Sequence, residues 1–188
     1  MARLHVIDRF ATQPPEPSRD VALDQALLRA YSLDRSVDYG CALEDAGTLR
    51  ARVEAGFAWS EVATALGSDH EDRAALATDA PVTAARFKRL AAACHRLAQA
   101  ALELDEPARL AAYRRQAAAF LDSMRPDLEK GLACFMPVDH GGAPHAAWLY
   151  RPVAAYRGPV VLVWGGADGW CEAFHSSVPF YLERGLAV

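Results

Sequence analysis

The chain has 188 residues, 52% of them apolar and 23% charged, a composition typical of a globular protein with one domain or two small ones. Its net charge of −4 excludes a general electrostatic attraction to nucleic acid or to an anionic membrane surface. No apolar run approaches the roughly 20 residues of a membrane-spanning helix, so we expect neither nucleic acid nor membrane as a partner.

The N-terminus and the cysteines bear on the cellular compartment. The first ten residues lack the long apolar segment of a signal peptide. The four cysteines, Cys41, Cys94, Cys134 and Cys171, are scattered and form no C-x-x-C pair. This pattern predicts reduced thiols in a cytoplasmic protein. It has no spacing typical of a structural zinc site, so no bound metal is expected.

The first part of the chain predicts helices. A short helix, capped by one of the polar residues 18–20, is expected to end near Tyr31. Residues 43–66 then carry apolar side chains at helical spacing, in two pieces divided near Gly56. We expect Gly67 to end the second piece.

The middle of the chain predicts a pair of helices. A capping Asp79 comes shortly before Pro81, and the apolar pattern then continues to Leu102. Pro107 opens a second helical pattern, which ends before Pro126. Because the connection is short, these helices should pack antiparallel as an αα-hairpin.

The pattern changes after Pro126. Residues 132–138 and 145–152 predict two strands of a hairpin, joined by a tight turn over residues 139–144. The continuous apolar run from Val160 to Trp164 predicts a further strand that is buried on both faces.

The change in pattern predicts two domains. Residues 1–130 form a helical domain, beginning with a loosely held arm over residues 1–17, where three prolines exclude a helix. Residues 131–188 begin an α/β sheet. The expected fold class is therefore α/β, with an all-helical domain preceding the first strands of the sheet.

A glycine-rich turn is expected directly after the buried strand. Gly165 and Gly166 let the backbone approach a ligand closely, with amide groups pointing outward. A helical pattern follows from Trp170 to about Arg184, with Asp168 as its cap, and its positive end faces the same place. Strand, turn and helix together predict an oxyanion or phosphate cradle. The spacing G-x-G-x-x-G of a nucleotide site is absent, so no cofactor is expected.

The C-terminal residues suggest an incomplete sheet. Gly185 is the expected left-handed stop of the last helix, and residues 186–188 begin another strand. A sheet of about three strands with an open apolar edge is unfavourable. We therefore expect the chain to be a fragment, or one half of a split protein.

Three stretches carry a family resemblance through their order and spacing. They are the alanine-rich helices containing residues 91–98, 104–107 and 112–115, the hairpin 135–152, and residues 160–185 with Gly165-Gly166-Ala167-Asp168, Glu172 and Phe174. Together they resemble the lid helices, the first core strands, and the oxyanion strand with its following helix in the helical-lid α/β-hydrolases. This family includes FrsA-like proteins, 2,6-dihydroxypseudooxynicotine hydrolase and polyketide-shortening hydrolases.

The resemblance implies a serine hydrolase that cleaves an ester, amide or activated C–C bond of a small aromatic or polyketide-like substrate. Its serine, on a G-x-S-x-G elbow, and its acid and histidine would all come after these 188 residues. The backbone amides of Gly166 or Ala167 would line the oxyanion hole, and Trp164, Gly165, Asp168 and Trp170 would contact substrate. The helices would form a lid over an apolar pocket and pair subunits into a homodimer. This chain alone should be inactive.

Other assignments compete for the same residues. Cys171, near a helix start with His175 beyond it, is a weak alternative nucleophile, and a packed thiol is the default. Glu172 is most simply a first-turn charge. His95, in an apolar helix, is expected to be a satisfied or surface histidine rather than a ligand in a lid pocket. The alternative for the whole chain is a non-catalytic helical module that binds a protein partner or a second copy.

Overall fold

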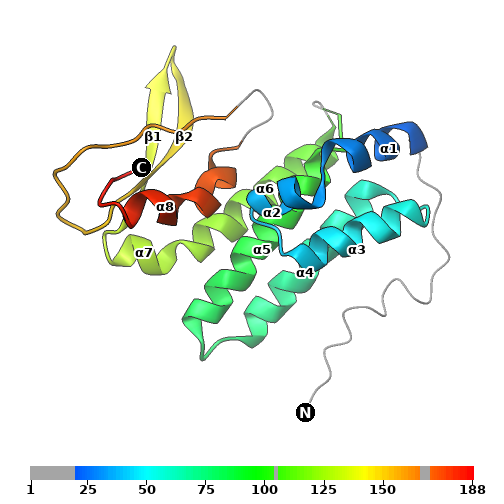
Figure 1. Ribbon diagram of the computed structural model, residues 1–188, viewed down its shortest axis with the longest axis horizontal. Coiled ribbons are helices and arrows are strands. Elements are labelled where there is room, and N and C mark those ends of the chain that lie inside the picture. The colour runs from blue at the N-terminus through cyan, green and yellow to red at the C-terminus, as the bar shows by residue number, and fades with distance from the viewer. Residues whose placement is uncertain (1–19, 104–105, 166–169) are drawn as a thin grey trace.

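The computed structural model describes residues 20–103, 106–165 and 170–188 (Figure 1). This part of the chain is mostly helical, with one small antiparallel sheet. The elements, in chain order, are α1 (Val21–Ala30), α2 (Leu33–Asp38), α3 (Leu43–Glu54), α4 (Trp59–Leu76), α5 (Pro81–Gln99), α6 (Pro107–Ser123), α7 (Arg125–Glu129), β1 (Ala133–His140), β2 (Ala143–Tyr150), the 3-10 helix η2 (Cys171–Ser177) and α8 (Val178–Leu182).

Local capping and turn chemistry define the first helices. Asp20 caps α1, because its carboxylate accepts a hydrogen bond of 2.8 Å from the Leu23 amide. Ser32 caps the short helix α2 in the same way. Gly56 separates α3 from α4 with a φ of +99°, a conformation that favours glycine. The expected break at this residue is therefore confirmed.

The expected end of a helix at Gly67 is wrong. Helix α4 continues through it to Leu76. Gly67 lies against the ring of His95 on α5, so its lack of a side chain serves close packing of two helices. A tertiary contact, absent from the local sequence signal, explains the glycine.

Helices α5 and α6 form the expected αα-hairpin, each with a proline in its first turn. Figure 1 shows them running between α1–α4 at one end of the molecule and the β-hairpin with α7 and α8 at the other. One apolar cluster joins α1, α3, α4 and α5 around Trp59 and Leu49. A second joins α5 and α6 to β1, β2 and α8 through Phe120, Met124 and Tyr150.

Strands β1 and β2 pair antiparallel, with Ala133 opposite Tyr150 and His140 opposite Ala143. The hairpin is confirmed, but its strands are longer and its turn shorter than predicted. Gly141 and Gly142 make the turn, with φ values of +64° and +80°, which suits a two-residue hairpin connection.

The expected buried strand over Val160–Trp164 is wrong. Val160, Leu162 and Trp164 are 60%, 78% and 76% exposed. The segment forms only an isolated parallel bridge, Val160 to Ala187, in the part of the chain that the structure describes. An apolar run becomes a buried strand only where neighbours cover its faces and pair its edges. The sheet that is present, a two-stranded hairpin, does not establish an α/β-hydrolase core.

The expected helix from Trp170 to Arg184 is also wrong in detail. A 3-10 helix occupies residues 171–177 and a short α-helix residues 178–182. Pro179 explains the division, because it lacks the amide hydrogen that would bond to the carbonyl of His175 in a continuous α-helix. Gly185, with a φ of +70°, ends the segment as expected.

Residues 186–188 return to the sheet. The Val188 carbonyl accepts a 2.7 Å hydrogen bond from the Tyr150 amide, and the Val161 amide donates to the Ala187 carbonyl at 2.8 Å. The C-terminal residues thus link β2 to the segment around Val160 and Val161. None of the described helices combines the length and apolar composition needed to cross a bilayer.

Candidate substrate cavity

An open cavity of about 760 Å³ lies between β2, residues 160–165, η2 and helix α6. Its lining brings together Trp164, Gly165 and Trp170, which the sequence analysis assigned to substrate. The other residues of that assignment, Gly166, Ala167 and Asp168, lie outside the described residues. The structure therefore bears on the described walls of the cavity alone.

Aromatic side chains form much of the cavity wall. Tyr113 on α6 stacks against Trp170, with ring centroids 4.7 Å apart and an interplanar angle of 28°. Trp148 of β2 lines the same cavity and contacts Phe120 edge to face at 5.3 Å. Offset-stacked and edge-to-face arrangements are the favourable geometries for aromatic pairs, and flat rings suit a planar apolar ligand.

A buried polar chain connects the helices to the cavity. Gln99 on α5 donates to Gln116 on α6 at 2.6 Å, and Gln116 donates to the Glu172 carboxylate at 3.3 Å. Both glutamines are almost fully buried. Because a buried amide is costly unless it is hydrogen-bonded, this series of hydrogen bonds fixes the orientation of α5, α6 and η2 relative to one another. Glu172 is thus a structural link as well as a first-turn charge of η2.

Cys171 lacks the properties of an activated nucleophile. Burial, with a contribution from the Glu172 carboxylate, raises the pKa of its thiol to about 12. Burial also lowers the pKa of His175 to about 4, and the ring accepts or donates one bond of 3.3 Å, to the Tyr150 hydroxyl. The Cys171 thiol therefore stays protonated, and His175 is hydrogen-bonded to Tyr150 rather than to the thiol. This arrangement does not support cysteine catalysis.

His95 is buried in the core rather than a surface histidine, and its Nδ1 has no hydrogen-bond partner among the described residues. Its Nε2 lies 2.9 Å from a carboxylate oxygen of Glu71, which also pairs with Arg115. Burial is the largest cause that lowers the pKa of His95. The residue lines neither the aromatic cavity nor a second cavity nearby, so nothing points to a ligand there.

The second cavity, of about 790 Å³, lies between α4, α5, α6 and α7. Alanines form much of its wall, and most of its charged groups pair with one another. Lys88 lies 3.0 Å from Asp122, and Arg115 pairs with Glu71. Such pairs leave little charge to recognise a ligand, so the aromatic cavity is the better candidate site.

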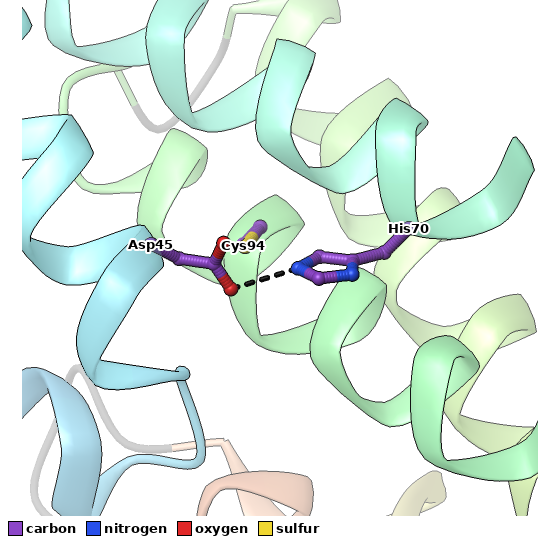
Figure 2. Close-up of side chains that lie close together, drawn as sticks. All are labelled: Asp45, His70 and Cys94. Carbon is purple, nitrogen blue, oxygen red and sulfur yellow. Dashed lines mark hydrogen bonds and ion pairs between the residues drawn. The ribbon is translucent and has the colours of Figure 1, made fainter. Parts of the chain in front are cut away.

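Sequence reasoning missed a third feature, the cluster of Asp45, His70 and Cys94. Figure 2 shows the Asp45 carboxylate from α3 pointing at the His70 ring from α4, with Cys94 of α5 beside them. Their ligand-type atoms all lie within 4.8 Å of one another. Spacings of about 24 residues follow no motif, so only the packing of three helices reveals the cluster.

Comparison with protein-family models and with curated proteins finds no match to this chain.

Proposed function

We propose that this chain supplies the helical lid and one wall of the active site of an α/β-hydrolase that acts on a small aromatic or polyketide-like substrate. The observation that supports this most is the aromatic cavity. It joins Trp164 and Gly165, on the approach to the glycine turn, to Tyr113 on a lid helix.

In this proposal the chain contributes charge stabilisation rather than a nucleophile. Backbone amides at Gly166 and Ala167 receive the oxyanion that forms when a serine attacks the substrate carbonyl. One such donor is typically worth about 3–4 kcal/mol of transition-state stabilisation. The serine, its histidine and the acid come from a C-terminal hydrolase part, in the same or a second chain. The bond cleaved is an ester, an amide or an activated C–C bond. For the C–C bond, a stabilised carbanion leaves and the histidine protonates it.

The proposal extends to assembly and location. The helices pair two subunits, and the protein works in the cytoplasm. The support for the location is that all four cysteines are free thiols, as they would be in a reducing compartment.

The cavity is tested by calorimetric titration of the 188-residue chain with a hydroxylated aryl ketone such as 2,6-dihydroxyacetophenone. We expect saturable binding that Trp164→Ala weakens about tenfold, since an aromatic pair adds about 0.5–1.5 kcal/mol beyond the area it buries. Trp164 is largely exposed, so its loss should leave the fold unchanged. The matched control is Leu76→Ala, an equally exposed apolar residue on α4, outside the lining of the cavity. Equal binding by both variants would argue against the cavity as the substrate site.

The oxyanion role is tested in a form that also carries the serine, histidine and acid. Gly166→Val should abolish most aryl-ester turnover while circular dichroism stays unchanged. Turnover by the isolated 188-residue chain that survives Cys171→Ala would contradict the proposal.

The alternative function is a non-catalytic helical interaction module. Leu76 and Val82, on either side of the α4–α5 turn, are both more than three-quarters exposed, which is favourable for docking of a partner. This alternative predicts that Gly166→Val leaves function intact, whereas Leu76→Asp with Val82→Asp abolishes partner binding.

A further inference from the structure

Three helices, α3, α4 and α5, bring metal-ligating side chains together outside the lining of the aromatic cavity. The Asp45 Oδ2 and His70 Nε2 atoms are 2.7 Å apart, and the Cys94 sulfur completes a group whose atoms all lie within 4.8 Å (Figure 2). Around a tetrahedral zinc ion, ligand atoms are separated by about 3–4 Å. A small opening of the Asp45–His70 pair is therefore enough to admit an ion.

The cluster is closed to solvent. His70 and Cys94 are almost fully buried, and the side chain of Asp45 is 13% exposed. None of these residues lines the aromatic cavity or the cavity between α4, α5, α6 and α7. Structural zinc sites take all four ligands from the protein, whereas catalytic sites keep a position open for water or substrate, so a buried cluster fits a structural role.

A second sulfur is available beside the first. The Cys41 thiol, just before α3, forms a hydrogen bond with the Cys94 thiol. Cys41 is not among the residues whose ligand atoms lie within 4.8 Å of one another, so its side chain has to turn toward them to serve as a fourth ligand. A set of two sulfurs, one imidazole and one carboxylate suits zinc, while calcium and magnesium prefer oxygen ligands alone.

The histidine is free to ligate. Its other ring nitrogen, Nδ1, has no hydrogen-bond partner among the described residues, although it is buried. A shift of the ring proton from Nε2 to Nδ1 therefore breaks no bond at Nδ1 and leaves the Nε2 lone pair for a metal.

We propose that Asp45, His70 and Cys94, with Cys41 as the fourth ligand, bind a structural zinc ion that joins α3, α4 and α5. Three anionic ligands, the Asp45 carboxylate and the thiolates of Cys94 and Cys41, give the zinc site a net charge of −1, which the nearby Arg96 guanidinium offsets. Both thiol protons pass to solvent when the metal binds. Cysteine spacing predicted no zinc site, because these ligands come from separate helices. The proposal is independent of the hydrolase assignment.

The test is titration of the reduced, chelator-treated chain with Co²⁺. We expect one Co²⁺ per chain, with an intense near-ultraviolet band from sulfur-to-cobalt charge transfer, and displacement of the cobalt by one equivalent of Zn²⁺. Cys94→Ser should abolish the band. Asp45→Asn retains the size of the side chain and its contact with His70, and should weaken Co²⁺ binding at least about tenfold.

Matched controls exclude binding elsewhere. Cys134→Ser removes a cysteine outside the cluster, and His140→Ala with His145→Ala removes the neighbouring histidine pair on the β-hairpin, whose ring centroids are 6.1 Å apart. These variants should bind Co²⁺ like the wild type. The absence of a sulfur band in the wild-type chain, or wild-type affinity in Cys94→Ser or in Asp45→Asn, would overturn the proposal.

Discussion

At the scale of single residues, contacts between helices decide what each side chain does. Trp59 is buried, and its indole donates a 2.8 Å hydrogen bond to the Leu97 carbonyl. His95 is buried with a carboxylate partner, and His70 with another. None of these partners is a sequence neighbour, so residue type alone leaves their roles open.

Gly67 and Gly47 should respond oppositely to alanine. A Cβ at Gly67 would lie 2.6 Å from the Nδ1 of His95, whose ring is buried and tied to Glu71. We expect Gly67→Ala to lower the free energy of unfolding by about 1–3 kcal/mol through overpacking. Gly47, in α3, has no atom within 4 Å of an added Cβ. Gly47→Ala should therefore raise the free energy of unfolding by about 1 kcal/mol. Urea denaturation of both variants measures these changes, and equal effects would be evidence against the packing of Gly67 on His95.

His175 should make stability depend on pH. Burial, then the nearby Arg89 cation, lower its pKa from 6.5 to about 4 in the folded protein. Between these two pKa values His175 is protonated in the unfolded chain and neutral in the folded chain. The free energy of unfolding therefore falls as the pH falls from about 6.5 to 4. The contribution reaches about 3 kcal/mol. His175→Phe should remove this part of the pH dependence, measured as the free energy of unfolding at pH 7 and pH 4.5 against the wild type. An unchanged slope would contradict the burial of a neutral ring.

At the scale of elements, helix α5 organises the molecule. It contributes Cys94 and Leu97 to the cluster around Trp59, and Ala92 to the cluster around Phe120. Its run of small side chains lets α4 and α6 approach closely. Gln99 adds a directional link to α6.

Loss of one buried glutamine should cost more than loss of both. Gln116→Leu leaves the Gln99 amide buried without its 2.6 Å partner, and we expect it to lower the free energy of unfolding by about 1–3 kcal/mol. Adding Gln99→Leu should restore part of this loss, because no glutamine amide is then buried without its partner. A double-mutant cycle in urea measures the coupling. Additive losses would show that the two amides do not interact in solution.

At the scale of the whole molecule, stability should be unequal along the chain. In the segment 162–165, Leu162 and Trp164 are exposed and no regular strand forms, whereas residues 91–98 lie in the centre of the helical core. In hydrogen–deuterium exchange we expect the amides of 162–165 to exchange at the earliest times and those of 91–98 only through global unfolding. Comparable protection in the two segments would mean that Val160–Trp164 is a paired strand in solution.

Much of the fold could be predicted from local pattern. Pro81 and Pro107 begin the helices of the αα-hairpin, and Gly56 divides α3 from α4. In each case the backbone conformation follows from the residue type at that position, without help from distant contacts. Gly67 misled the prediction, since the atom that requires a glycine belongs to His95, 28 positions away. Trp164, Gly165 and Trp170, which the sequence places around one site, line one cavity, and their role in binding substrate stays a prediction.

The sequence by itself determined where the two helices of the αα-hairpin begin, that a β-hairpin follows them and which residues flank the glycine-rich stretch, because backbone preferences act over a few residues. Only the tertiary structure decided that an apolar run from Val160 to Trp164 is exposed, and that Asp45, His70 and Cys94 meet. Burial and coordination depend on what lies across space, and neither is encoded in the spacing of residues along one element.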